Sequence, residues 1–376
     1  MKIVVAIDSF KGSLSSLQAG NAVKEAVSRL SDNAEIIIKP LADGGEGTVE
    51  ALAEISNAEM AELEVNGPLM KPVVAKYCIL NDTNTAVIEM ASASGITLIS
   101  TDERNPLETT TFGVGELIKD AIKKGCRRFI VGIGGSATND GGTGMLTALG
   151  YEFLDKNNNP IALGAKGLKG LHRIKTDNVL PELKECQFNI ACDVTNPLCG
   201  KNGCSAVFGP QKGATPEMIK DMDAWLENYA ELAKTVSSKA DKTYAGAGAA
   251  GGLGFAFLVF TNATLKSGIE IVLEEIDIEA DIKNADIVVT GEGRLDSQTV
   301  MGKAPIGVAK LAKKYGKKVI AFSGCVTDDA EVCNAHGIDA FFPVLRGVTT
   351  LEEALDTNNA YKNLEATAYQ VFRVLI

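Results

Sequence analysis

The sequence predicts an α/β protein of two domains: a parallel-sheet domain built from both chain ends, and a mixed α/β domain inserted into it. Strands and helices alternate at both ends of the chain, which is typical of parallel sheets. The alternation stops in the middle, and 376 residues exceed the length of one ordinary domain. We expect residues 1–66 and 281–376 to form the first domain and residues 67–280 the inserted one.

Both chain ends follow the same order of elements. Apolar, β-branched runs predict strands, and the amphipathic stretches between them predict helices. At the N-terminal end we expect a strand, a helix, a strand and a helix, at residues 3–7, 15–30, 35–39 and after 47. At the other end we expect strands at 287–290, 319–323 and 341–344, with helices at 303–315, before the last strand and at the end of the chain.

The inserted domain opens with a different pattern. Near Asn66 the alternation ends, and the runs 73–80 and 85–90 flank four turn residues, 81–84. This arrangement predicts an antiparallel hairpin. A further strand is expected at 188–192.

A helix with one apolar face is predicted later in the inserted domain. Thr215 is its expected cap and Pro216 its first residue. Its apolar face consists of Met218, Ile219, Met222, Trp225, Leu226 and Tyr229. We interpret this face as part of the core; the alternative is a contact between the subunits of a homodimer.

The composition favours small-molecule partners. The net charge of −11 argues against binding to nucleic acid or to an anionic membrane. The longest later apolar stretch, 253–260, is shorter than the about 20 residues that span a bilayer. Eight cysteines lack paired CxxC spacing, which is typical of reduced thiols in the cytoplasm. We expect a cytoplasmic protein with no nucleic-acid or membrane partner.

The most informative segment is residues 128–144, where a β-branched strand runs into a loop with six glycines. Glycine permits positive φ and lets backbone N–H groups approach a ligand closely. Phosphate is the expected ligand, and a tight strand-to-helix connection without a ligand is the alternative. The candidate binding residues are Gly134, Gly135, Ser136, Thr138, Asn139, Asp140 and Gly141.

The same loop nearly fits a dinucleotide fingerprint. Gly132, Gly134 and Ala137 satisfy G-x-G-x-x-G/A, and an acidic residue follows about 20 residues on. An NAD(P)-dependent oxidoreductase acting on a small hydroxy acid is therefore one alternative function. The inserted position of the loop counts against it, since this fingerprint belongs to a βαβ unit. A non-catalytic sensor of a small acid is the other alternative.

Polar, glycine-rich loops follow five of the predicted strands. They are residues 8–13, 43–48, 132–144, 193–196 and 291–297. In open α/β sheets the ligand lies outside the carboxyl ends of the strands, so together these loops predict one cleft between the domains. For any single loop, ordinary turn chemistry is the alternative.

The side chains of these loops suit phosphoryl transfer. That reaction uses carboxylates for a divalent metal and for the attacking hydroxyl, and positive groups around the phosphates. The carboxylates are Asp8, Asp43, Asp193 and Asp296, and the positive groups are Lys11, Arg294 and Lys303. Separately, Arg104 precedes a run of hydroxyl residues and can hold a substrate carboxylate; a surface ion pair is its alternative.

Several motifs together carry a resemblance to a known family. They are VAIDSFKGSLSS (4–15), PLADGGEGT (40–48), NPLETTTFGVGELI (105–118), VGIGGSATNDGGTGM (131–145), CDVTNPLCG (192–200), FGPQKGA (208–214), GAGAAGGLG (246–254) and TGEGRLDSQTVMGKAP (290–305). In these motifs the chain resembles the bacterial class I glycerate kinases. The resemblance implies ATP-dependent phosphorylation of D-glycerate, generally at the 2-hydroxyl, giving 2-phosphoglycerate and ADP with Mg²⁺. It also implies that the domain built from both chain ends is flavodoxin-like.

Carried onto matching positions, the resemblance suggests roles for individual residues. Asp193 is expected to orient the glycerate hydroxyl, Asp8 and Lys11 to lie beside the transferred phosphate, and Asp43 or Asp296 to bind Mg²⁺. The further residues expected to bind substrate or phosphate are Asp43, Gly44, Gly45, Glu46, Asn196, Glu292 and Arg294.

Overall fold

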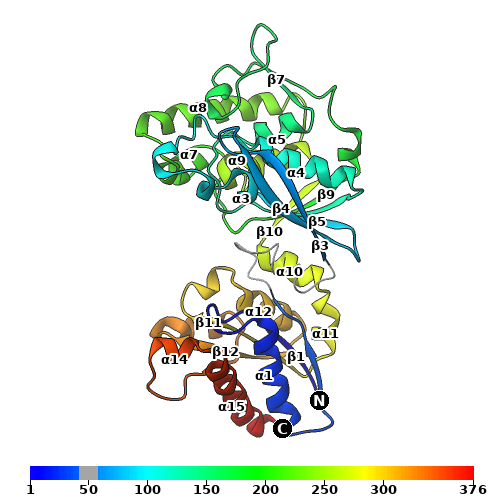
Figure 1. The fold of residues 1–376 in the computed structure, drawn as a ribbon, viewed down its shortest axis with the longest axis vertical. Helices are drawn as coiled ribbons and strands as arrows, with labels where there is room; N and C mark the ends of the chain where they lie inside the picture. Colours follow the sequence, from blue (N-terminus) through cyan, green and yellow to red (C-terminus); the bar gives the residue numbers. More distant parts are fainter. Residues whose placement is uncertain (42–57) are drawn as a thin grey trace. The chain divides into compact units, whose positions relative to one another are not determined.

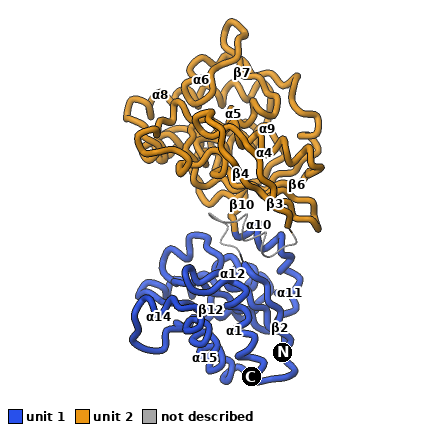
Figure 2. The backbone as a smooth tube through the Cα atoms, in the orientation of Figure 1, with its two compact units in different colours: residues 1–47, 269–376 blue, residues 48–268 orange. Residues whose placement is uncertain are grey.

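The computed structural model describes residues 1–41 and 58–376. The chain forms two compact units (Figure 2): unit 1 comprises residues 1–47 and 269–376, and unit 2 comprises residues 48–268. Each unit has its own hydrophobic core. The predicted α/β fold class is confirmed, since unit 1 contains a parallel sheet and unit 2 a mixed one. The predicted domain bounds stay a prediction.

Unit 1 is built on a five-stranded sheet in which every strand pair is parallel. Its strands are β1 (Lys2–Ile7), β2 (Glu35–Ile38), β11 (Ile287–Leu295), β12 (Lys318–Val326) and β13 (Ala340–Pro343). They lie in the order β13-β12-β11-β1-β2. Counted along the unit, this is the 2-1-3-4-5 order of flavodoxin-like sheets. Both chain ends therefore contribute strands to one sheet.

Among its described residues, unit 1 contains seven α-helices. They are α1 (Ser16–Ser28), α10 (Gly268–Glu275), α11 (Ile278–Asn284), α12 (Ala304–Lys314), α13 (Val332–Ala335), α14 (Leu351–Leu355) and α15 (Thr357–Leu375). Figure 1 shows α1 and α15 side by side, and Val23 and Leu364 from these two helices share a core with Val5 of β1. α1 begins where predicted because Ser15 and Gln18 form a capping box.

The predicted loop 291–297 is wrong for its first five residues, because the pairing of β11 with β12 continues to Leu295. Gly291 permits this continuation: a Cβ there would lie 2.0 Å from the carbonyl oxygen of Phe322. One of the glycines that suggested a loop is therefore needed where two strands approach closely. The polar residues of this stretch therefore stand on a strand.

Unit 2 is built on a six-stranded mixed sheet. Its strands are β3 (Ala58–Asn66), β4 (Pro72–Leu80), β5 (Thr85–Glu89), β6 (Arg128–Gly132), β9 (Gln187–Ala191) and β10 (Ala263–Lys266), in the order β10-β9-β6-β5-β4-β3. The predicted hairpin is confirmed, since β4 and β5 pair antiparallel with Leu80 opposite Thr85. From β5 to β10 the pairs are parallel, so four carboxyl ends lie at one edge. β7 (Glu152–Leu154) and β8 (Arg173–Lys175) form a separate pair.

The helices of unit 2 surround this sheet. They are α3 (Ala91–Ser94), α4 (Phe112–Lys123), α5 (Thr143–Ala148), α6 (Ala165–Leu168), α7 (Cys204–Phe208), α8 (Pro216–Ala233) and α9 (Ala249–Phe260). α8 is capped by Thr215, as predicted. Met222, Leu226 and Tyr229 on its apolar face are buried in the core, so the interpretation of these three as core residues is confirmed. Among the described residues, no helix has the length and apolarity that crossing a bilayer requires.

Candidate active site

The glycine-rich loop of unit 2 presents an exposed turn at the carboxyl end of β6. Gly134 and Gly135 are exposed, and Gly135 has a φ of 70°. Two backbone hydrogen bonds connect this turn to residues 94–96. Ile96 N donates to Gly135 O at 2.8 Å, and Ala137 N donates to Ser94 O at 2.9 Å. Within the described residues, the N–H groups of residues 134–136 have no acceptor. Successive backbone N–H groups in a turn can form an anion-binding concavity, so this turn is a candidate anion site.

A buried lysine lies beneath this turn. Lys212 is 2% exposed, and its Nζ donates to Ser136 Oγ at 2.8 Å and to Thr138 O at 2.6 Å. It ends a short 3-10 helix, η4 (Pro210–Lys212), which α7 contacts. Burial lowers the pKa of Lys212 to about 8. Lys212 was not among the site residues predicted from the sequence, although it belongs to the motif FGPQKGA.

Asp140 is an internal anchor of the loop. It is fully buried, and its carboxylate accepts hydrogen bonds from Thr111 N at 2.8 Å and Gly142 N at 3.0 Å, with Thr110 and Gly144 as further donors. Burial raises the pKa of this carboxyl, and the hydrogen bonds oppose that rise. Asp140 therefore fastens the hydroxyl-rich segment before α4 to the glycine-rich loop.

The neighbours of Asp140 also point inward. Thr138 and Asn139 are fully buried, and Asn139 Nδ2 donates to Ser205 Oγ at 2.8 Å. Gly141 has a φ of 65° and its N–H donates to Gly251 O at 2.9 Å. Of the seven loop residues selected from the sequence, Gly134 and Gly135 are exposed and Ser136 is 8% exposed. The other four are buried.

Arg104 lies close to the lysine-bearing segment. A Cβ at Gly213, the residue after Lys212, would lie 2.3 Å from the carbonyl oxygen of Arg104 and 3.2 Å from its Cβ. The Nε of Arg104 is buried and has no hydrogen-bond partner within the described residues. Arg104, Lys212 and the glycine-rich loop, which are far apart in sequence, therefore meet in unit 2.

Asp193 and Asn196 follow the neighbouring strand, β9. Gly132 at the end of β6 pairs with Ala191 at the end of β9, so Asp193 stands at the same sheet edge as the exposed turn. Asp193 is exposed, and its Oδ1 accepts from Gly268 N at 3.2 Å. Asn196 has an internal role as well, because its Nδ2 donates to Asn202 O at 2.9 Å.

At the sheet edge of unit 1, Asp8 follows β1 and is 5% exposed. Its Oδ1 accepts from Ser9 N at 2.7 Å, and its own N–H donates to Gly291 O at 2.9 Å. Lys11 is exposed in the same loop, and a Cβ at Gly293 would lie 3.4 Å from Lys11 N. β1 and β11 therefore bring Asp8 and Lys11 to the polar end of β11.

That end of β11 carries a cluster of charges. Glu292 is buried and accepts from Thr299 Oγ1 at 2.6 Å; Lys303 Nζ lies 3.4 Å from Glu292 Oε2 and 3.9 Å from Asp296 Oδ1. Arg294 Nε lies 3.4 Å from Asp296 Oδ2. Burial raises the pKa of Glu292, while Thr299 and Lys303 oppose the rise. The structure thus brings together Glu292, Arg294 and Asp296, which were selected from the sequence.

Besides Lys212, two candidate site residues were not predicted from the sequence. Glu89 ends β5 beside Gly132, at the same sheet edge as the exposed turn. The sequence feature that could have identified it is a carboxylate at the end of an apolar strand. Thr299 donates a hydrogen bond to Glu292. The sequence feature that could have identified it is a hydroxyl shortly before the helix that begins at residue 304. Four other candidates, Asp43, Gly44, Gly45 and Glu46, lie outside the described residues.

The acidic residues allow a simple test of the metal prediction. Among the described residues, no group of three or more His, Cys, Asp and Glu side chains could enclose a metal ion. A magnesium ion that accompanies a nucleotide needs only one or two protein carboxylates, since phosphates and water fill its other positions. Glu292 and Asp296, which both approach Lys303, fit that smaller requirement.

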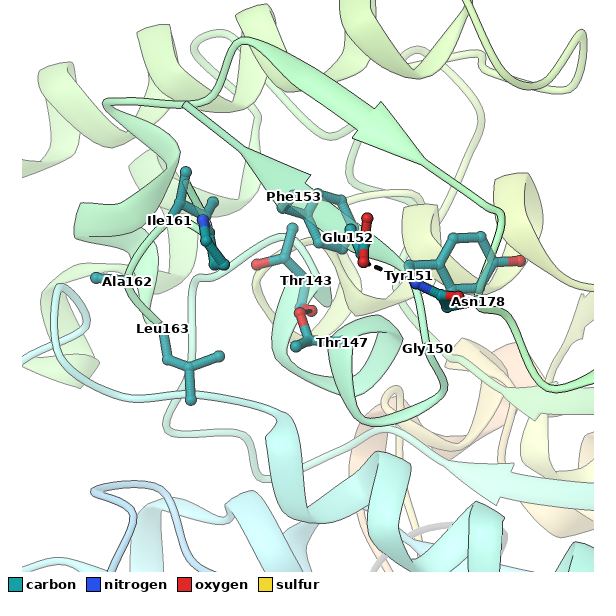
Figure 3. A pocket seen from close by; sticks show the side chains of 11 residues that line it. Thr143, Thr147, Gly150, Tyr151, Glu152, Phe153, Ile161, Ala162, Leu163 and Asn178 are labelled. Atoms are coloured by element: carbon teal, nitrogen blue, oxygen red, sulfur yellow. Dashed lines mark hydrogen bonds between the residues drawn. The ribbon is translucent and has the colours of Figure 1, made fainter. Parts of the chain in front are cut away.

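A separate cavity of about 250 Å³ lies beside α5 (Figure 3). Its walls include Thr143, Thr147, Phe153 and Leu163, and Asn178 Nδ2 donates to Glu152 Oε1 at 2.8 Å at its rim. No residue selected from the sequence as a site residue lines it. The candidate anion site is therefore the exposed turn and not this cavity.

Comparisons with known proteins cover nearly the whole chain. Residues 3–376 match the glycerate kinase family. The chain is 47% identical over 375 residues to a glycerate kinase of Haemophilus influenzae, covering 100% of this chain and 99% of that one. It is 48% identical to glycerate 2-kinase of Escherichia coli, covering 97% and 95% respectively. The crystal structure of a glycerate kinase 2 candidate from Salmonella typhimurium LT2 matches with 48% identity and a TM-score of 0.87, covering 100% and 98%.

Proposed function

The chain belongs to the glycerate kinase family, and from this premise we propose that it transfers the γ-phosphoryl group of ATP to the 2-hydroxyl of D-glycerate. The products are 2-phosphoglycerate and ADP. One observation carries this proposal beyond the family: the parallel strands of each unit end in anion-binding groups of different charge. Unit 2 offers backbone N–H groups over one buried lysine, and unit 1 offers the cationic side chains of Arg294 and Lys303 near two carboxylates.

Charge matching assigns the substrates to the two edges. The phosphates of ATP carry several negative charges, which suit Lys11, Arg294 and Lys303 at the edge of unit 1. Glycerate carries one charge on a planar carboxylate, which suits the N–H groups of residues 134–136 above Lys212. We therefore assign the nucleotide phosphates to unit 1 and the carboxylate of the acid to unit 2.

Asp193 is our candidate for the residue that orients the attacking hydroxyl. Its carboxylate is exposed at the same sheet edge as the proposed carboxylate site, so one substrate can reach both. The 2-hydroxyl oxygen of D-glycerate forms a bond to the γ-phosphorus, its proton passes to Asp193, and the bond from the γ-phosphorus to the bridging oxygen of ADP breaks. Asp8 and Lys11 are assigned to the transferred phosphoryl group.

Magnesium is part of the proposal. Glu292 and Asp296 would hold the ion, together with Asp43, which lies outside the described residues. When bound, Mg²⁺ neutralises part of the phosphate charge. Lys303 lies between the two carboxylates and keeps their negative charge compensated when the ion is absent. We also place the reaction in the cytoplasm, which agrees with eight free cysteines.

An assay of ADP release tests the proposed reaction. With Mg²⁺ and ATP, D-glycerate should produce ADP at a rate that saturates with D-glycerate, whereas L-glycerate and buffer alone should produce little. A protein that binds D-glycerate without turnover would be a sensor. An oxidoreductase would be stabilised against heating by NADH and not by Mg-ATP, and either outcome would contradict the proposal.

A further inference from the structure

Lys212 is a buried charge whose effect on the neighbouring turn the proposed reaction does not specify. Its amine is enclosed with Asp140 and Cys204 as the titratable groups that act on it. The Cys204 thiol, whose pKa burial raises to about 11, stays neutral at physiological pH. Burying an ammonium group costs free energy, and here its hydrogen bonds go to a hydroxyl and a backbone carbonyl. Because this burial costs free energy, we look for a functional role of Lys212 outside the core.

The two hydrogen bonds of Lys212 hold both ends of one short turn. Ser136 Oγ and Thr138 O are two residues apart, and the same Nζ atom contacts both. The other side of the turn carries the N–H groups of residues 134–136, which have no acceptor within the described residues. Lys212 therefore supports the turn from the buried side, while Gly134 and Gly135 of the same turn are exposed to solvent.

The chemistry of lysine also fixes the direction of the Ser136 hydroxyl. An ammonium group only donates hydrogen bonds, so Ser136 Oγ must accept the bond from Lys212. Its own hydrogen then remains for another acceptor, and none is found within the described residues. A hydroxyl that accepts from a cation is a stronger donor. Ser136, which is 8% exposed, can offer that hydrogen to a ligand at the turn.

We infer that Lys212 is a positioning residue of the acid-binding site: it orients Ser136 and the turn 134–136 so that four hydrogens meet the carboxylate of the acceptor substrate. This inference rests on the proposed function. A single ammonium charge under the turn complements a monoanionic carboxylate, whereas the polyphosphate chain of ATP finds more positive charge in unit 1. Arg104, beside Gly213, adds long-range attraction for the same anion.

The test is the substitution Lys212→Met, which keeps the length of the side chain and removes its charge and donors. The variant should fold with a Tm within a few degrees of wild type, because the relief from burying a charge offsets the two lost hydrogen bonds. Its KM for D-glycerate should rise on the order of 10- to 100-fold, as expected for lost hydrogen bonds to a charged group, while its KM for ATP changes less than about twofold. Lys234→Met, an exposed lysine of unit 2, is the matched control and should leave both constants unchanged.

A substrate analogue separates carboxylate recognition from a general structural role. D-Glyceramide has the same hydroxyls and no negative charge. Wild type should prefer D-glycerate in kcat/KM, and Lys212→Met should lose most of that preference. The kcat/KM of wild type for D-glycerate should also fall above about pH 8, as Lys212 loses its proton, and this fall should be absent from Lys212→Met. Cys204, whose pKa burial raises to about 11, does not change charge near that pH.

Several results would overturn the inference. Equal increases in the two KM values, an unchanged preference for D-glycerate over D-glyceramide, or a loss of kcat alone would each contradict it.

If Lys212→Met does not fold, the substitution Ser136→Ala decides. It should raise the KM for D-glycerate several-fold and leave the KM for ATP unchanged. Titration calorimetry with D-glycerate measures binding without turnover. An enzyme that binds D-glycerate through Lys212 and forms no phosphoester would refute the proposed function and support the inference.

Discussion

The sheet edges of the two units carry similar glycine-rich, acidic motifs, but different interactions hold their polar residues. In unit 2, Asp140 and Lys212 are buried and bonded mainly to backbone groups and hydroxyls. In unit 1, Arg294, Asp296 and Lys303 contact one another as ion pairs that are open to solvent to different degrees. Buried hydrogen bonds fix a geometry, whereas partly exposed ion pairs exchange partners at low cost. This contrast supports our proposal that unit 2 presents a preformed anion site, whereas the charges of unit 1 rearrange around phosphate.

The largest effect is expected from an exposed acid of unit 2, Asp193. Asp193→Asn should lower kcat about 10²- to 10⁴-fold, since the amide cannot take the hydroxyl proton, while Tm stays within about 2 °C of wild type. Steady-state kinetics and thermal unfolding measure the two quantities. Asp177→Asn, at another exposed position of unit 2, should change neither. Equal losses of activity and stability would make Asp193 a structural residue.

The buried acid of the same unit should behave in the opposite way. Asp140→Asn turns an NH₂ group toward donors such as Thr111 N and Gly142 N, and the free energy of unfolding should fall by about 2–4 kcal/mol. Urea unfolding measures this change. The matched control is Asp155→Asn, a half-buried residue just before a turn that accepts from Asn157 N and Asn159 N, and it should cost about 1 kcal/mol or less. A fully stable Asp140→Asn variant would remove the contrast between the two units.

A smaller effect is expected when one charge is removed from unit 1. Lys303→Met should raise the KM for ATP about tenfold, which is about 1.4 kcal/mol, and leave the KM for D-glycerate nearly unchanged. Its stability should change by less than about 1 kcal/mol, because the lysine is partly exposed. Lys310→Met, an exposed position on the same helix, is the control. If the KM for D-glycerate rises instead, the two substrates have been assigned to the wrong units.

The smallest effect is a pH dependence of stability at Glu292. Burial raises its pKa in the folded protein, so its contribution to stability is fully present below its unfolded pKa and decreases as pH rises through the folded value. Glu292→Gln does not titrate. The stability of the variant relative to wild type should therefore increase from about pH 4 to about pH 7.5, as measured by urea unfolding at both values. A difference that is independent of pH would show that the carboxyl is not perturbed.

Local sequence signals predicted much of the fold. Apolar runs located most of the strands, although β3, β7, β8 and β10 were not predicted. Ser15 and Thr215 marked helix starts that the structure confirms. Such signals fail where the meaning of a residue depends on distant partners. Asp140 resembled a ligand-binding residue because it stands among glycines, and only its contact with Thr111, 29 residues away, places it in the interior.

The same limit applies to the candidate site. Lys212 meets Ser136 across 76 residues of sequence, and no local pattern connects them. Glycines were ambiguous for a similar reason: Gly291 suggested a loop, yet it is required by the approach of Phe322 on a neighbouring strand. The sequence thus indicated which segments carry the site, whereas burial decided which of their residues face the solvent.

The most direct test of the proposed function is the phosphorus NMR spectrum of the product formed from D-glycerate and Mg-ATP. A phosphate ester at the 2-hydroxyl is bonded to a carbon with a single hydrogen, so proton coupling should split its signal into a doublet, alongside the signals of ADP. A triplet would identify an ester at the 3-hydroxyl and contradict the proposed position. Inorganic phosphate without any ester would contradict phosphoryl transfer to glycerate altogether.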